Sequence, residues 1–137
     1  MKYITVLVTT NGMREARRIG DGLLKKKLCA CVNIVPKVHS KYWWKGKLEA
    51  AAECLMIIKT TGASFPALEK TVKKLHSYTV PEIIALPIIK GNKQYLSWIS
   101  ASCKEGAPAF ERPLAHAFGG TARPAKRFRR EKLGSPQ

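Results

Sequence analysis

The strands predicted for this chain are apolar on both faces, and this feature restricts its fold more than any other. Residues 2–9 are mostly β-branched, aromatic or otherwise apolar, at odd and even positions alike. Later predicted strands carry pairs of adjacent isoleucines, each placing one side chain on either face: Ile57-Ile58, Ile83-Ile84 and Ile88-Ile89. A soluble monomer does not leave an apolar sheet face of that size in water. The sequence therefore predicts self-association, which would cover the sheet face that carries no helices.

The order of predicted elements is βαββαβ followed by one more helix. Asn11 and Asn92 are expected to cap the first and last helices, and Pro36 and Pro87 to mark bulges or sheet edges. Strands are expected over 2–9, 29–35 resuming at 38–44, 47–60 and 82–89, with a Lys45-Gly46 turn and a second helix opening at Gly62 to Pro66. Four strands and two crossover helices in this order predict a ferredoxin-like α/β sandwich with both main helices on one face.

Length and charge divide the chain into a domain and a tail. The 137 residues suit one domain, and the net charge is +16. Residues 1–103 hold 17 basic and 6 acidic residues, whereas 14 of the 34 residues in 104–137 are Ala, Gly or Pro. We therefore expect a folded domain over 1–103 and a flexible basic tail over 104–137 that is dispensable for folding. The basic runs also predict non-specific binding of polyanions.

Composition also bears on the compartment. No apolar run approaches the length of a transmembrane helix, and the N-terminal segment does not have the pattern of a signal peptide. We therefore expect a cytoplasmic protein with no membrane partner. The four cysteines are then expected to be thiols in a reducing compartment, which disfavours a secreted disulfide scaffold.

Several segments together resemble one known family, the divalent-cation tolerance proteins called CutA. They cover about residues 3–102 in collinear order: 28–36, 40–47, Glu53, 58–61, 75–87 and 95–98. The resemblance implies a tightly packed homotrimer of ferredoxin-like subunits, similar to PII signalling proteins. It also implies a link to copper and other divalent metals, and no established enzymatic activity.

Two groups of residues are candidate metal ligands. Cys29 and Cys31 lie two apart on a predicted strand and would share a face, where they could hold Cu(I) or simply be small buried residues. His76 closes the second helix, where a histidinium would gain from the helix dipole. The resemblance instead implies a metal ligand, but Val8 and Leu75 stand where its thiolate and second His would be. We expect weak, pH-dependent copper binding involving His76, with no metal required for folding.

A second set of candidates concerns the subunit junction. Lys59, Tyr78 and Glu82 could line a polar pocket between subunits, or form ion pairs that fix the geometry of the trimer. Tyr42, Trp43 and Trp44 are consecutive on a strand, so Tyr42 and Trp44 share one face and Trp43 takes the other. We expect these aromatics to be interface anchors rather than a platform for a ligand.

Other functions are weighed against this one. An RNA-recognition module shares the βαββαβ order but needs stacking aromatics on its third strand, and 47–53 contains none. An acyl- or phosphoryl-transfer enzyme is disfavoured because the chain has no Gly-rich phosphate loop and no evident nucleophile–base pair. A PII-like sensor of a small anion or nucleotide stays open as an alternative to the metal-related binding protein.

Overall fold

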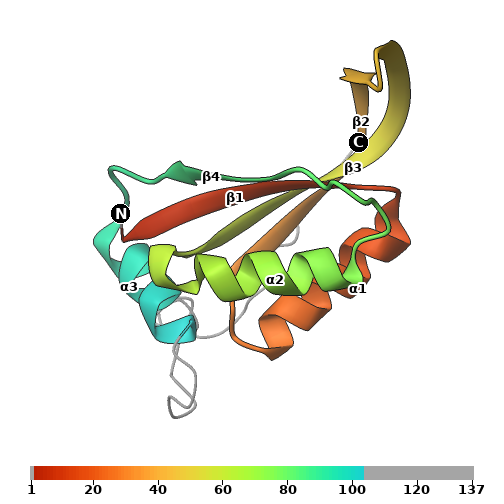
Figure 1. Cartoon of the computed structure of the whole chain (residues 1–137). Helices are drawn as coiled ribbons and strands as arrows, with labels where there is room; N and C mark the ends of the chain where they lie inside the picture. Colours follow the sequence, from red (N-terminus) through yellow and green to blue (C-terminus); the bar gives the residue numbers. More distant parts are fainter. Residues whose placement is uncertain (1, 104–137) are drawn as a thin grey trace, which may run out of the picture.

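The computed structural model describes residues 2–103, and the predicted order of strands and helices is confirmed (Figure 1). The elements are β1 (Tyr3–Thr10), α1 (Met13–Lys25), β2 (Cys31–Trp44), β3 (Lys47–Thr61), the 3-10 turn η1 (Gly62–Ser64), α2 (Phe65–Leu75), β4 (Ile83–Pro87) and α3 (Lys93–Ser102). The basic tail predicted over 104–137 lies outside the described residues.

The four strands form one antiparallel sheet in the order β2-β3-β1-β4. Helices α1 and α2 lie side by side against one face of this sheet, and α3 lies at one end of it (Figure 1). The arrangement is the ferredoxin-like α/β sandwich that the sequence predicts. Pro87 lies in the edge strand β4, where the missing N–H of a proline is tolerated.

The core lies between the sheet and the two main helices. Alternate residues of β1, Ile4, Val6 and Val8, are buried there against Ile19 and Leu23 of α1. The two helices approach closely at Gly22, where an added Cβ would lie 3.1 Å from a methyl carbon of Leu75. A glycine in the middle of a helix costs about 1 kcal/mol relative to alanine, and here this close approach accounts for it.

The opposite face of the sheet is also apolar, and none of the helices within residues 2–103 is packed over its centre (Figure 1). We call it the open face and define it by Leu7, Leu55, Ile57, Ile84 and Leu86. Leu7 pairs with Ile57 on one side and with Ile84 on the other, so these side chains form a row across three strands. Ile84 is 50% and Leu86 is 44% exposed in the single chain. The prediction of a sheet that is apolar on both faces is confirmed.

Strands β2 and β3 continue past the rest of the sheet as a long hairpin that projects from the body (Figure 1). Its turn is Lys45-Gly46, as predicted, and both residues have positive φ angles, 50° and 77°. Two positive angles are typical of the type I′ turn that joins twisted strands. On the hairpin, Trp43 lies opposite Leu48, and the two are 73% and 64% exposed.

Some local expectations are confirmed and others are corrected. The register of β2 against β3 shifts between Val35 and Val38, so the bulge expected at Pro36 is present. Asn92 caps α3, because its Oδ1 accepts a hydrogen bond from the Tyr95 N–H at 3.1 Å. Asn11 does not cap α1: the N-cap is Gly12, and no side chain caps it. β4 is shorter than predicted and ends at Pro87.

Candidate functional site

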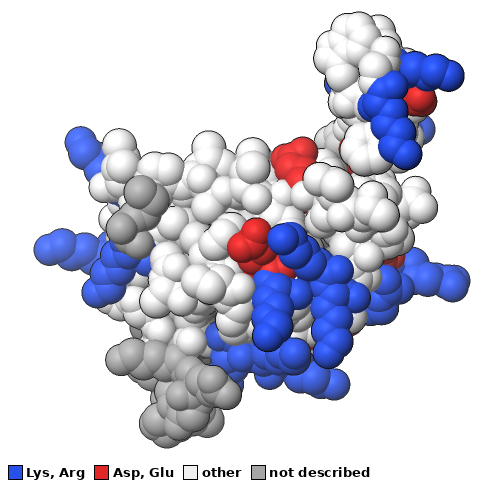
Figure 2. Space-filling view, in the orientation of Figure 1, with Lys and Arg blue, Asp and Glu red and all other residues white. Residues whose placement is uncertain are grey.

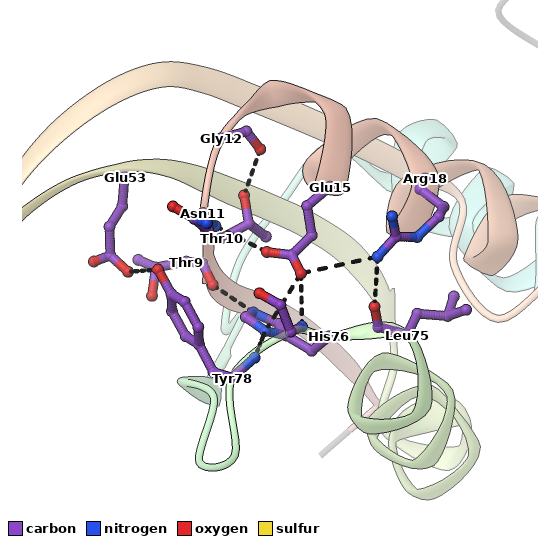
Figure 3. Close-up of polar contacts among 11 residues, drawn as sticks. Thr9, Thr10, Asn11, Gly12, Glu15, Arg18, Glu53, Leu75, His76 and Tyr78 are labelled. Carbon is purple, nitrogen blue, oxygen red and sulfur yellow. Dashed lines mark hydrogen bonds and ion pairs between the residues drawn. The ribbon is translucent and has the colours of Figure 1, made fainter.

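Glu15 links the start of α1 to the end of α2 (Figure 3). Its carboxylate is nearly buried and accepts hydrogen bonds from two backbone N–H groups, those of Asn11 at 2.9 Å and Ser77 at 2.6 Å. Burial works to raise the pKa of Glu15, but the hydrogen bonds from Asn11 and Ser77 outweigh it, so the pKa is lowered. Glu15 therefore stays ionised and holds the segment that follows α2.

His76 is the first residue after α2, and its side chain is completely buried. Its Nε2 lies 2.7 Å from the carbonyl oxygen of Thr9, and its Nδ1 lies 3.0 Å from the Tyr78 N–H (Figure 3). The carbonyl can only accept and the N–H can only donate, so the ring is neutral, with its proton on Nε2. The ring holds the 76–78 segment to β1 and is not the helix-end histidinium that the sequence suggested.

These contacts bear on whether His76 fits a metal ion. Nδ1 accepts a hydrogen bond and Nε2 carries the proton, so neither nitrogen has a free lone pair for copper. Val8 is fully buried, and no group of three His, Cys, Asp or Glu side chains within residues 2–103 is placed to hold a metal ion. The side chains of this part of the chain therefore do not fit a resident copper ion.

The two candidate thiols do not share a strand face, which corrects the sequence prediction. The strand begins only at Cys31, because Lys27 takes a positive φ of 56° and turns the chain after α1. Cys29 is buried in the core, and burial, with the nearby thiols of Cys103 and Cys31, raises its pKa to about 12. A thiol that stays protonated is a poor metal ligand at neutral pH. Cys31 is half-buried instead and pairs with Lys59 across the strands.

Lys59 lies in a different part of the sheet from Tyr78 and Glu82, although the sequence predicts one polar pocket for all three. Its Nζ contacts the Asn33 side-chain oxygen and lies 4.0 Å from the Cys31 sulfur. Tyr95 of α3 also belongs to this group: burial and then the neighbouring Cys31 thiol raise the pKa of its hydroxyl to about 12. The structure therefore places Lys59 in a polar cluster between β2, β3 and α3.

Tyr78 and Glu82 do lie together, in a pocket at the base of the hairpin with a volume of about 740 Å³. Tyr78 donates a hydrogen bond from its hydroxyl to Glu53 of β3 at 2.7 Å (Figure 3). The lining residues are Thr9, His39, Ser40, Lys41, Tyr42, Trp44, Glu53, Ser77, Tyr78, Thr79, Val80 and Glu82. Of the predicted aromatic cluster, Tyr42 and Trp44 line the pocket, whereas Trp43 does not.

The pocket carries a negative field centred on Glu53. Burial and the hydrogen bond to Glu53 raise the pKa of Tyr78, so its hydroxyl stays protonated and donates. Burial and then the charge of Glu53 also raise the pKa of Glu82. Glu53 is not among the predicted site residues, although a carboxylate within the otherwise apolar stretch 50–58 is a signal that points to it.

Comparison with known proteins gives one consistent result. The family model described as "CutA1 divalent ion tolerance protein" matches residues 4–102. The divalent-cation tolerance protein CutA of Thermus thermophilus is 49% identical over 94 residues, which are 69% of this chain and 91% of that protein. The chloroplastic protein CutA 1 of Oryza sativa is 47% identical over 102 residues, which are 74% of this chain and 58% of that protein.

Solved structures agree with these sequence matches. The crystal structure of CutA1 from Oryza sativa has a TM-score of 0.74 and 45% identity, and the match covers 77% of this chain and 97% of that one. A structure described as the periplasmic divalent cation tolerance protein CutA from Archaeoglobus fulgidus has a TM-score of 0.73 and 44% identity, covering 74% of this chain and 99% of that one. Within residues 2–103, no helix is long and apolar enough to cross a membrane.

Proposed function

Because the chain belongs to the CutA1 divalent ion tolerance protein family, we propose that it is a non-enzymatic binding protein that acts as a homotrimer in the response to divalent metals. The relatives are named for divalent-cation tolerance, which links this chain to the same process. The observation that carries the proposal is the open face, which a trimer would cover.

The open face and the hairpin support the trimer together. Ile84 and Leu86 expose apolar area on the sheet, and Trp43 and Leu48 expose more on the hairpin. Burying apolar area stabilises an assembly by about 25 cal/mol for each Å² removed from water. A hairpin that extends beyond its own sheet can reach a neighbouring subunit, where Trp43 and Leu48 would serve as anchors.

The mass in solution tests the trimer. The subunit is 15.2 kDa, and we expect light scattering coupled to gel filtration to give three times this value at micromolar concentration. The trimer should persist on dilution, because apolar interfaces of this kind are obligate. A folded species with the mass of one subunit at every concentration would contradict the proposal.

The polar contacts support a binding role rather than catalysis. The buried Glu15 and His76 form their hydrogen bonds with backbone N–H and C=O groups. Such contacts are typical of side chains that hold the backbone in position. Tyr78 stays protonated and hydrogen-bonded to Glu53, so it offers no activated nucleophile.

The link to copper is proposed in a weak form, without a preformed site. His76 would have to give up the Tyr78 N–H bond before it could ligate, whereas His39 is exposed and lines the pocket. We therefore expect Cu(II), which broadens nearby NMR signals, to broaden the ring signals of His39 at low metal ratios and to leave those of His76 sharp. The effect should weaken in acid, because a protonated imidazole cannot ligate a metal ion. Broadening of His76 first would show that it is a ligand after all.

Two further expectations stay proposals. We place the protein in the cytoplasm, because all four cysteines are free thiols. The matched relatives carry the descriptions chloroplastic and periplasmic, so fractionation of the source cells is the test.

Figure 2 shows Lys and Arg gathered over the side of the molecule where α1 lies, and exposed basic residues of α1 include Arg14, Arg17 and Arg18. This surface would bind polyanions non-specifically, with an affinity that falls as salt rises.

A further inference from the structure

The pocket at the base of the hairpin gathers carboxylates in a strongly basic molecule. Residues 1–103 contain 17 basic but only 6 acidic residues. Two of the acidic residues, Glu53 and Glu82, line this one pocket. Burial and then the charge of Glu53 raise the pKa of Glu82, and both side chains line the same cavity.

Glu53 is only partly satisfied by its neighbours. The residue is 8% exposed, and one carboxylate oxygen accepts the Tyr78 hydroxyl at 2.7 Å. The other oxygen accepts no hydrogen bond and forms no ion pair with any residue that the structure describes. A largely buried carboxylate without a cationic partner attracts a cation that enters the pocket.

The walls of the pocket suit an organic cation. Tyr42, Trp44 and Tyr78 supply aromatic surface beside the two carboxylates. Trp44 already attracts a cation, because the Lys45 Nζ lies 5.8 Å from the centre of its indole ring. Aromatic faces next to carboxylates are the surroundings in which proteins hold ammonium groups.

Other ligand classes fit less well. No group of three His, Cys, Asp or Glu side chains within the described range is arranged to hold a metal ion. An anion such as a nucleotide would face Glu53 and Glu82 across the pocket. Lys41 and His39 also line the pocket, but both are exposed, and the long Lys41 side chain can keep its ammonium group in water.

We propose that this pocket binds a small organic ammonium ion, with Glu53 and Glu82 supplying the negative charge and Tyr42 and Trp44 the aromatic walls. The ammonium group donates to the free oxygen of Glu53, and its alkyl part lies against Trp44. All of these residues belong to one subunit, and the proposal does not depend on metal binding.

A pair of probes of the same size tests the charge requirement on the unmodified, full-length protein. We expect isothermal titration at low salt to give saturable binding of n-butylammonium and at least about tenfold weaker binding of butan-1-ol. Butylammonium binding should weaken in acid, because protonation removes the charge of Glu82, whose pKa is raised by burial and then by the charge of Glu53. Equal binding of the two probes, or no binding of butylammonium, would overturn the proposal. So would displacement of butylammonium by ATP in direct competition, because it would identify an anion site.

Two pairs of variants locate the site. Glu53→Gln should weaken butylammonium about tenfold, whereas Glu69→Gln removes the same charge on α2, away from the pocket, and should leave the affinity unchanged. Trp44→Leu should weaken it about fivefold, whereas Trp44→Phe, which keeps an aromatic wall, should retain most of the affinity. Equal effects within either pair would overturn the assignment. Circular dichroism checks that each variant is folded, and the probe comparison stays decisive if one is not.

Discussion

Replacing Glu15 by Ala should lower the free energy of unfolding by about 3 kcal/mol, because two buried backbone N–H groups lose their acceptor. The carboxylate joins Asn11, before α1, to Ser77, after α2. Its loss therefore releases the start of α1 from a segment that lies 62 residues beyond Glu15 in the chain. Urea unfolding followed by circular dichroism, at one fixed protein concentration, measures the change.

The pH dependence separates this role from a general effect of mutation. The pKa of Glu15 is lowered in the folded state, so its contribution is fully present above the ordinary glutamate value of about 4.3 and is lost as pH falls through the folded value. The difference between the parent protein and Glu15→Ala should therefore be constant from neutral pH to about 5 and shrink in stronger acid.

A surface carboxylate gives the matched control. Glu69 forms an exposed pair with Lys73 at 3.8 Å on α2, and such pairs are worth about 0.5 kcal/mol or less. Glu69→Ala should therefore leave the unfolding midpoint almost unchanged. Equal losses in the two variants, or a Glu15→Ala deficit that does not shrink in acid, would contradict the role given to Glu15.

Replacing Ile84 by Lys should convert the trimer into monomers. The side chain is 50% exposed in the single chain, so a monomer would accept the lysine at little cost. In the proposed trimer the same side chain is covered, and each of three buried ammonium groups would cost several kcal/mol without a partner. Light scattering should therefore give the mass of one subunit, or of an aggregate, in place of the trimer.

Leu24 of α1 is the control for this variant. It is 42% exposed, close to the value for Ile84, but it lies on the helical side of the molecule. Leu24→Lys should leave the mass in solution at three subunits. A trimer that tolerates Ile84→Lys as well as it tolerates Leu24→Lys would show that the open face is not the interface.

Periodicity predicted most of the fold. The strands were visible because β-branched and aromatic residues fill them, and the turn at Lys45-Gly46 because glycine readily adopts positive φ. The cap of α1 was mispredicted: Gly12 is the N-cap, and the Asn11 backbone N–H donates to the Glu15 carboxylate four residues later. The same carboxylate also accepts the Ser77 N–H, a tertiary contact that local sequence does not contain.

The site was predicted less well, because its residues come from separate elements. Tyr78 and Glu82 are close in the sequence and were grouped correctly, but Lys59 was added to them and lies with Cys31 instead. The role of Glu53 depends on the register of β3 against its neighbours. Cys29 and Cys31 were assigned to one face on strand periodicity, which fails because the strand begins only at the second of them.

The bulge at Pro36 determines which aromatic side chains of β2 lie on the face that carries the pocket. Before it, Val35 pairs with Leu55, and after it, Val38 pairs with Glu53, so β2 has gained one residue relative to β3. Even-numbered residues of β2 thereby take over the face that odd-numbered ones held, which brings Tyr42 and Trp44 to the side of Glu53. Deleting one residue at the bulge would exchange the two sets and turn Trp43 toward the pocket. The number of residues at the bulge therefore determines which aromatic side chains face the pocket, although Pro36 itself does not line it.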